Sequence, residues 1–385
     1  MALTTDQEKA LRKVIRWYYD TSFNKNNLFT ISGFAGCGKT WLTNVIINIL
    51  GLPSWSILIV TFTNKAADIV RRRGLQAATI HKTFYNIHKG PNGRYYFKLK
   101  SSLPSSIKLI IIDEFSMVND DFLNDIMSFG IYTIALGDTA QLPPVIGKNS
   151  ILDDHDKVDA HLTQIVRQQK NSPILDLATM ARNHETPAIG GYGNCNVFYM
   201  KDVKNILEYD VILCYKNETR FKLNNAIRLL LKRKSKYPEK GDKLVCTKTN
   251  YFHKIDYNDM PILSANGLPL IALEDARHKD NYIYLRYKPD FVSDDLTYFA
   301  TYCNTKIFER EKYKDMILLE TDESHDNVVD IDYGFCVSYY KSQGGEYDNV
   351  LVIMEHDVPS HIYYKALYTA ITRAKKKVDI VLNYY

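Results

Sequence analysis

Short apolar runs alternate with amphipathic stretches through the first third of the chain. Apolar runs of a length typical of buried strands lie at residues 28–32, 56–62, 109–112 and 132–136. Amphipathic stretches with a helical period lie at residues 6–19, 39–50 and 64–73. Strands that alternate with helices form parallel sheets that helices cover on both faces. We therefore predict an α/β domain with a parallel sheet in this part of the chain.

The same alternation returns in the second half of the chain. Predicted strands and helices lie at residues 210–215, 218–233, 334–338, 350–354, 363–373 and 378–382. Residues 240–332 interrupt this pattern with short strand-like segments and turns, which are typical of a small β-rich insert. In the first half, the GPNG turn at 90–93 and the aromatic run after it predict an inserted hairpin.

The length agrees with this division, because 385 residues are too many for one ordinary core. The predicted boundaries are 1–85 with 107–171 for the first α/β domain, 86–106 for its hairpin, 172–239 with 333–385 for the second α/β domain, and 240–332 for its insert.

Composition narrows the class of protein. No apolar run approaches the roughly 20 residues of a membrane helix, and the N-terminus lacks the apolar core of a signal peptide. The six cysteines form no CxxC pair, which argues against structural zinc and suits the reduced thiols of a cytoplasm. A net charge of +5 permits nucleic-acid binding without requiring it. We expect a soluble, cytoplasmic protein that binds no membrane.

The segment GFAGCGKT at Gly33–Thr40 matches the phosphate-binding pattern GxxxxGK[ST] in full. It lies between a predicted strand and a predicted helix, where backbone N–H groups can wrap around phosphate oxygens. A chance glycine-rich turn would not require this context. Lys39 is expected to reach the β- and γ-phosphates, and Thr40 to hold Mg²⁺.

Asp113 and Glu114 follow the apolar run 109–112 and supply candidate carboxylates. Asp113 can bind Mg²⁺ through water, and Glu114 can orient or deprotonate the attacking water. Two acids after an apolar strand are common, but downstream of a complete phosphate loop they favour a role in hydrolysis. Many unrelated proteins share these two motifs, so by themselves they predict only an NTPase.

A further segment, LGDTAQLPPV at Leu136–Val145, resembles motif III of the superfamily 1 helicases. Residues 162–168, 338–346 and 368–375 resemble motifs IV, V and VI, with Tyr340 in place of the usual His of motif V. The hairpin and the β-rich insert resemble the superfamily 1B, RecD/Dda-like branch. The resemblance covers nearly the whole chain. It implies two RecA-like P-loop domains, with a pin hairpin in the first and an SH3-like insert in the second.

The resemblance implies roles for residues around ATP. Gln141 would sense the γ-phosphate and couple it to the nucleic acid, and Arg167 and Arg373 would close on that phosphate. Gln7 would read adenine, and Glu346 would contact the ribose. The full nucleotide-binding set that the resemblance implies is Gln7, Gly33, Ala35, Gly36, Cys37, Gly38, Lys39, Thr40, Trp41, Gln343, Gly344 and Glu346.

The resemblance also implies contacts with nucleic acid. These residues are Thr63, Asn64, Thr79, His81, Ser338 and Tyr340. Residues 61–67 resemble motif Ia of the same helicases, which usually has Pro where this chain has Phe62. Phe97 of the hairpin, with Tyr95 and Tyr96 as alternatives, is the candidate that stacks on the last base pair. Ordinary packing of these aromatics, and a core or capping role for His81, are the competing interpretations.

We predict an ATP- and Mg²⁺-dependent DNA helicase that moves on single-stranded DNA, 5′→3′ by resemblance, and opens duplex junctions. A monomer is expected, in the host cytoplasm if the chain is phage-encoded, working with replication, repair or recombination proteins. One alternative is a P-loop ATPase that remodels protein or RNA without unwinding, or a small-molecule kinase; it leaves 136–145 unexplained. The other is a nucleic-acid-binding module with a degenerate ATP site, against which the intact site residues argue. DNA and RNA remain open as substrates.

Overall fold

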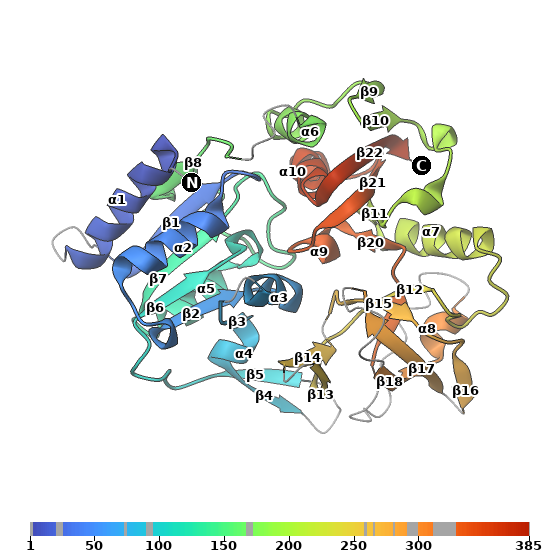
Figure 1. The fold of residues 1–385 in the computed structure, drawn as a ribbon, viewed down its shortest axis with the longest axis horizontal. Coiled ribbons are helices and arrows are strands. Elements are labelled where there is room, and N and C mark those ends of the chain that lie inside the picture. Colours follow the sequence, from blue (N-terminus) through green and yellow to red (C-terminus); the bar gives the residue numbers. More distant parts are fainter. Residues whose placement is uncertain are drawn as a thin grey trace. The chain divides into compact units, whose positions relative to one another are not determined.

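The computed structural model describes residues 3–20, 26–72, 75–89, 95–166, 172–257, 260–264, 266–279, 282–290, 299–310 and 329–384. The chain divides into two compact units, residues 1–88 with 96–184, and residues 89–95 with 185–385. Each unit contains a largely parallel sheet (Figure 1), so the predicted α/β fold is confirmed. Helix α6 (Pro173–Arg182) belongs to the first unit, where the Arg182 guanidinium lies 4.1 Å from the ring centroid of Phe34.

The sheet of the first unit has six parallel strands in the order β3-β2-β6-β7-β1-β8. They are β1 (Leu28–Gly33), β2 (Ile57–Thr61), β3 (Ala77–Thr79), β6 (Leu109–Ile112), β7 (Tyr132–Gly137) and β8 (Ala160–Leu162). The helices are α1 (Thr5–Tyr19), α2 (Lys39–Leu50), α3 (Asn64–Arg72), α4 (Ile80–Phe84) and α5 (Asp120–Met127). The sequence does not predict β3 and β8, because three residues are too few to show a period.

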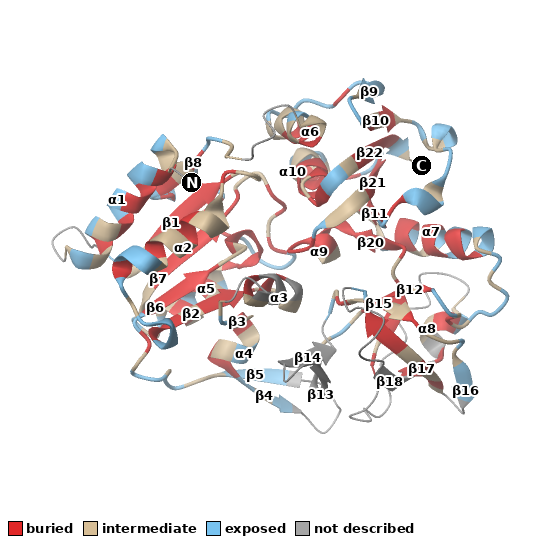
Figure 2. Ribbon diagram, viewed as in Figure 1, coloured by how far each residue is buried: buried red, intermediate tan, exposed pale blue. Residues whose placement is uncertain are grey.

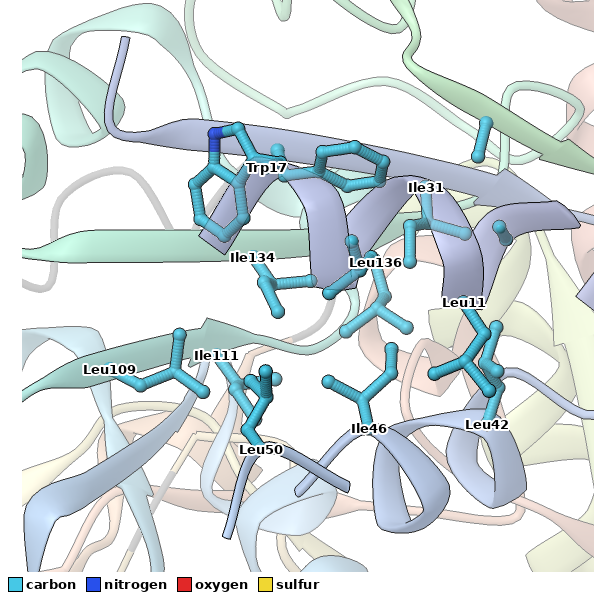
Figure 3. Packing of buried hydrophobic residues seen from close by; sticks show 14 of the residues in the cluster. Leu11, Trp17, Ile31, Leu42, Ile46, Leu50, Leu109, Ile111, Ile134 and Leu136 are labelled. Carbon is cyan, nitrogen blue, oxygen red and sulfur yellow. The ribbon is translucent and has the colours of Figure 1, made fainter. Parts of the chain in front are cut away.

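Side chains of this sheet point alternately to its two faces. In the run Leu109–Ile112, the first and third side chains pack with α1 and α2, and the second and fourth with α4 and α5. Figure 3 shows the first of these layers, in which Trp17 of α1 and Ile46 of α2 meet the strands. The strands are buried (Figure 2), and burial on both faces explains why the run is apolar without interruption.

The predicted hairpin in the first half forms a two-stranded sheet of β4 (Tyr85–Lys89) and β5 (Tyr95–Leu99). Its turn, at residues 90–94, lies outside the described residues.

The second unit contains a six-stranded sheet in the order β20-β11-β21-β22-β10-β9, in which only β9 is antiparallel to its neighbour. Its strands are β9 (Gly190–Tyr192), β10 (Cys195–Phe198), β11 (Val211–Cys214), β20 (Cys336–Ser338), β21 (Tyr347–Glu355) and β22 (Ala374–Tyr384). Its helices are α7 (Asn217–Leu230), α9 (Tyr339–Ser342) and α10 (Ser360–Ile371).

The β-rich insert of the second unit has an antiparallel sheet and a hydrophobic core of its own. The sheet contains β12 (Lys243–Cys246), β15 (Pro269–Ala272), β16 (Arg277–Lys279), β17 (Tyr282–Pro289), β18 (Phe299–Asn304) and β19 (Ile331–Tyr333). A separate hairpin, β13 (Asn250–Tyr257) with β14 (Met260–Ser264), and the short helix α8 (Lys306–Glu309) complete it. The chain enters through β12 and leaves through β19, and these two strands pair with each other.

The described residues contain neither a candidate membrane helix nor a candidate metal-binding cluster. No helix there is long and apolar enough to cross a membrane. No group of three or more His, Cys, Asp and Glu side chains within the same ranges is arranged to hold a metal ion.

Candidate nucleotide and nucleic-acid site

The motifs of the first unit gather at one edge of its sheet. Because all six strands are parallel, their carboxyl ends meet at the same edge. The phosphate loop follows β1 there, Asp113 follows β6, Asp138 follows β7 and Thr63 follows β2. The fold therefore brings together residues that are up to about a hundred positions apart in the sequence.

The phosphate loop runs from β1 into the first turn of α2, which contains Thr40 and Trp41, both half-buried. Gly38 has a φ of 78°, in the left-handed region, and a Cβ there would lie 2.7 Å from Nε2 of Gln7. Both conditions require glycine. Gly36 is also left-handed, and Cys37 is buried. Gly36 and Gly38, two of the predicted nucleotide residues, thus have the left-handed backbone that only glycine adopts readily.

Lys39 extends its amino group back into the loop. Its Nζ donates to the carbonyl oxygens of Gly33 at 2.5 Å and Phe34 at 3.3 Å, and lies 4.0 Å from Oδ2 of Asp138. Burial works to lower the pKa of this lysine, but nearby acidic groups outweigh burial and raise it. In order of size these groups are Asp138, Cys37, Glu114 and Asp113. The lysine therefore stays cationic in a site that also contains three carboxyl groups.

Asp113 and Glu114 adopt a tight local arrangement after β6. The Asp113 Oδ1 accepts from the Glu114 N–H at 3.0 Å. Glu114 has φ 56° and ψ 44°, a left-handed conformation that costs a residue with a side chain roughly 1–2 kcal/mol. Strain of this kind persists where surrounding structure imposes it, and it is common at active sites.

Asp138 is a candidate site residue that does not belong to the set predicted from the sequence. It is 1% exposed, and Ser116 holds it, donating to its carbonyl oxygen and accepting from its N–H. It is the largest of the acidic influences on the pKa of Lys39. Its position directly after an apolar strand, as for Asp113, was the available signal. Its closeness to Lys39 depends on β7 lying beside β1, which the sequence does not reveal.

Gln141 lies in the loop after β7, and its backbone N–H donates to the Asp138 carbonyl oxygen at 3.2 Å. Its side chain is 5% exposed, and the side-chain oxygen has no hydrogen-bond partner in the described part of the chain. A buried acceptor without a partner costs about 1–3 kcal/mol. This amide is therefore poised to accept a hydrogen bond from water or a bound ligand.

Gln7 has a structural role in addition to the predicted contact with adenine. It is fully buried, and its amide oxygen accepts from the N–H of Thr4, completing the capping box of α1. Its Nε2 donates to the carbonyl oxygen of Cys37 at 2.8 Å. Gln7 thus connects the start of α1 to the phosphate loop. Contact with adenine stays a prediction.

The predicted nucleic-acid contacts of the first unit also have local roles. Thr63 caps α3, accepting from Ala66 N–H at 3.2 Å, and Asn64 is the first residue of that helix. Thr79 caps α4, accepting from Lys82 N–H at 3.4 Å. Both threonine hydroxyls lie at helix N-termini, where anions bind readily.

His81 lies among aromatic rings. Its ring centroid is 5.0 Å from those of Phe97 and Phe122, and 5.9 Å from that of Phe62. Burial lowers the pKa of His81, which favours the neutral imidazole. Phe97 is 39% exposed and occupies the middle of β5 rather than the hairpin turn. The structure therefore brings together His81 and Phe97, two of the predicted nucleic-acid residues. Their contacts are equally those of an aromatic core, so both interpretations fit this cluster.

In the second unit, Arg373 is 6% exposed and held by local oxygen atoms. Its guanidinium donates to the carbonyl oxygens of Thr369 at 3.1 Å and Gly345 at 3.3 Å, and to the hydroxyl of Thr372 at 3.2 Å. Gly345 belongs to the motif V segment, so the end of that segment and Arg373 lie together, before β21 and β22 begin.

The start of the motif V segment lies at the other end of this sheet. Ser338 ends β20 and caps α9, accepting from Lys341 N–H at 3.4 Å, and Tyr340 is half-buried. Within the same segment Gln343 and Gly344 are buried, and Glu346 is exposed. Arg167, the remaining predicted arginine, lies outside the described residues.

The lowered pKa of Lys341 in α9 predicts a pH dependence of the free energy of unfolding. Burial, with the Arg220 guanidinium next, lowers its pKa to about 8. An unfolded lysine has a pKa of about 10.4. Between these two pKa values the unfolded chain binds more protons than the folded chain, so the free energy of unfolding rises with pH. Below pH 8 both states are protonated, and this term is constant. Lys341→Met is expected to remove a rise of up to about 3 kcal/mol between pH 8 and 10.5, measured by urea unfolding.

The matched control for that measurement is Lys222→Gln, because the Lys222 side chain is 65% exposed. It should leave the pH dependence as in the wild type. A stability difference between wild type and Lys341→Met that stays flat across this range would contradict the assigned pKa.

Two family models match the chain. One, described as an AAA domain, matches residues 2–197, and the other, described as a UvrD-like helicase C-terminal domain, matches residues 333–381.

Several curated proteins are similar in sequence. The ATP-dependent DNA helicase dda of Enterobacteria phage T4 is 26% identical, and the match covers 74% of this chain and 71% of that protein. An uncharacterized protein of Methanocaldococcus jannaschii is 24% identical over 93% of this chain, and the ATP-dependent RecD2 DNA helicase of Deinococcus radiodurans is 28% identical over 43%. The chain spans only 37% and 23% of the lengths of these last two proteins.

Solved structures share the fold. The Pif1 helicase from Bacteroides, in complex with ADP-AlF3 and single-stranded DNA, matches with a TM-score of 0.53 and 19% identity, covering 98% of this chain and 92% of that one. The Pif1 helicase from Candida albicans matches with a TM-score of 0.51 and 17% identity, covering 99% and 95%. The predicted fold of two RecA-like domains is confirmed.

Proposed function

This chain belongs to the AAA domain family and to the superfamily 1B helicases of the RecD/Dda-like type, and from that membership we propose that it is an ATP-driven motor that moves along single-stranded DNA and separates duplex strands. The observation that carries the proposal is that Lys39, Asp113, Glu114 and Asp138 gather at the carboxyl edge of one parallel sheet, with the Lys39 Nζ 4.0 Å from Oδ2 of Asp138. This cluster has the cation, the metal-binding carboxylate and the base that phosphoryl transfer to water requires.

The chain's own residues have distinct roles in hydrolysis. Lys39 leaves the loop carbonyls and binds the β- and γ-phosphate oxygens, neutralising charge that develops in the transition state. Glu114 accepts a proton from the attacking water. The Thr40 hydroxyl and Asp113 are the ligands that fit Mg²⁺, which prefers hard oxygen donors and would neutralise phosphate charge when bound. The buried oxygen of Gln141, which has no hydrogen-bond partner among the described residues, is suited to a water held against the γ-phosphate.

Arg373 and Arg167 are proposed to add two cations at the γ-phosphate. Arg373 is held by carbonyl oxygens in the described structure, so it must exchange those acceptors for phosphate oxygens. Gln343, Gly344 and Glu346 are proposed to contact the nucleotide from the same segment. Rearrangement of these contacts between the ATP and ADP states would supply the conformational step of a motor.

Single-stranded DNA is proposed to bind through its backbone to helix N-termini and hydroxyls. In the first unit these are Thr63, Asn64 and Thr79, and in the second Ser338 and Tyr340. His81 and Phe97 present an aromatic surface on which a base can stack. Such contacts have little sequence preference and weaken with salt.

Strand displacement on tailed duplexes tests this function. The wild type is expected to displace a strand from a duplex with a 5′ single-stranded tail, and to leave a 3′-tailed duplex intact. Phe97→Ala is expected to slow displacement about tenfold, because one stacked base contributes about 1–3 kcal/mol, while ATP hydrolysis on single-stranded DNA continues. Displacement only from the 3′ tail would contradict the branch assignment. Single-strand-stimulated hydrolysis without displacement would instead indicate a motor that remodels other substrates.

A further inference from the structure

Helix α7 has three buried polar residues along one side, Arg220, Asn224 and Arg228. They recur every four residues, so they lie along one side of the helix at about 6 Å intervals. They are 2%, 2% and 8% exposed, whereas Leu229 at the end of the helix is 75% exposed. A helix that buries two arginines while exposing a leucine must use those arginines for specific contacts.

Arg228 holds the segment where the insert begins. Its Nε lies 3.1 Å from Oδ2 of Asp242, the residue just before β12, and Arg233 Nε lies 2.8 Å from the other carboxylate oxygen. Asp242 is fully buried. The Arg228 guanidinium also lies 4.2 Å from the ring centroid of Tyr333, in the strand by which the chain leaves the insert. One side chain thus contacts both ends of the insert.

Arg220 holds the segment where the insert ends. Its Nη1 lies 2.8 Å from Oδ2 of Asp332, and Arg310 Nη2 lies 2.6 Å from the same oxygen. All three side chains are 2–3% exposed. Burial works to raise the pKa of Asp332, but the two arginines outweigh it and lower that pKa, so the carboxylate stays ionised.

Asn224, between the two arginines, holds the strand that follows. Its side-chain amide donates to the Cys336 carbonyl oxygen at 2.9 Å and accepts from the Cys336 N–H at 2.9 Å. These two hydrogen bonds pair the Asn224 side chain with the backbone of β20, which is the edge strand of its sheet. Gly334, between Asp332 and Cys336, would bring a Cβ within 2.8 Å of the Leu244 backbone, so only glycine fits there. The path from the insert to α9 of motif V is therefore fixed at each step.

Stability alone does not account for these contacts. Replacing a buried ion pair by apolar residues of similar volume is often neutral or stabilising. An arginine contact also fixes the orientation of its partner, because the N–H donors of the guanidinium group lie in one plane at fixed angles. The guanidinium groups of Arg220 and Arg228 and the amide of Asn224, all on one helix, therefore define the orientation of the insert relative to the second RecA-like domain.

We propose that Arg220, Asn224 and Arg228 are positioning residues that make the insert a rigid extension of the second RecA-like domain, so that movements of that domain during ATP turnover reach the strand being separated. The inference rests on the proposed motor function. It predicts that weakening the contacts of these three residues uncouples hydrolysis from strand separation without preventing hydrolysis.

The test uses the full chain with Arg220→Lys and Arg228→Lys together. These substitutions retain the positive charges and remove the planar guanidinium groups. Hydrolysis stimulated by single-stranded DNA is expected to stay within about twofold of wild type, while displacement per ATP falls about tenfold. The control on the same helix is Lys222→Gln, whose exposed side chain should leave both unchanged. Equal losses of hydrolysis and displacement, or no loss of either, would overturn the proposal. Thermal unfolding identifies a double variant that fails to fold, for which Arg228→Lys alone is the substitute.

A distance measurement tests rigidity without relying on activity. Spin labels at Asn225→Cys on α7 and Arg277→Cys on β16 are accessible, whereas all six native thiols are buried. Wild type is expected to give one narrow distance distribution, with and without single-stranded DNA, and the double variant a broader one. Equal widths would overturn the proposal. A narrow distribution in a protein that displaces no strand would refute the proposed function and leave the positioning role standing.

Discussion

Replacement of Lys39 by alanine is expected to lower ATP hydrolysis stimulated by single-stranded DNA by about a thousandfold. Lys39 is the cation of the phosphate loop, and three carboxyl groups close to it would otherwise repel the triphosphate. Removing the lysine leaves that repulsion uncompensated, so both nucleotide affinity and the rate of phosphoryl transfer should fall. Steady-state phosphate release, with nucleotide affinity measured separately by a fluorescent ATP analogue, distinguishes the two effects.

The control for this variant is Lys108→Ala, since Lys108 is an exposed lysine of the same unit that donates to the Ser105 carbonyl oxygen. It should hydrolyse ATP as the wild type does. If Lys39→Ala retained more than about a tenth of wild-type turnover, the phosphate loop would not be the site of hydrolysis.

Glu114→Gln is expected to reduce hydrolysis by about a thousandfold while ATP still binds. The amide keeps the size of the side chain and the strained left-handed backbone, but it cannot accept a proton from water. Because the loop, Lys39 and Asp113 remain, the variant should accumulate in an ATP-bound state on single-stranded DNA. Single-turnover hydrolysis and ATP binding, measured on the same preparation, test both halves of this expectation.

The exposed Glu8 of α1 provides the matched control, and Glu8→Gln should be silent. Turnover by Glu114→Gln within about tenfold of wild type would exclude Glu114 as the base. Asp113 would then be the candidate base, since it is the neighbouring carboxylate that also acts on the pKa of Lys39.

Part of the candidate nucleotide site can be proposed from the sequence, because the motifs that carry it are short continuous segments. The phosphate loop is a continuous segment, and Asp113 is recognisable from the apolar run before it. The closeness of Asp138 to Lys39 could not be predicted, because it depends on the order of strands in the sheet. The contact between His81 and Phe97 is likewise set by how the hairpin packs, not by any spacing.

The insert shows the same limit on a larger scale. Turn-forming residues and short apolar runs predict its β-rich character. They do not predict its connection to α7, because Arg220 and Asp332 are 112 residues apart in the chain. An arginine on an amphipathic helix is ordinarily a solvated residue, and only the fold shows that these arginines are buried against carboxylates.

The contact between Gln7 and the phosphate loop has a consequence for how the chain can vary. Any side chain at position 38 would meet the Gln7 amide, and any shorter residue at position 7 would leave the Cys37 carbonyl oxygen without its donor. The two positions therefore constrain each other. A change acceptable at one depends on the residue at the other, so natural variants and designed libraries should explore positions 7 and 38 as a pair.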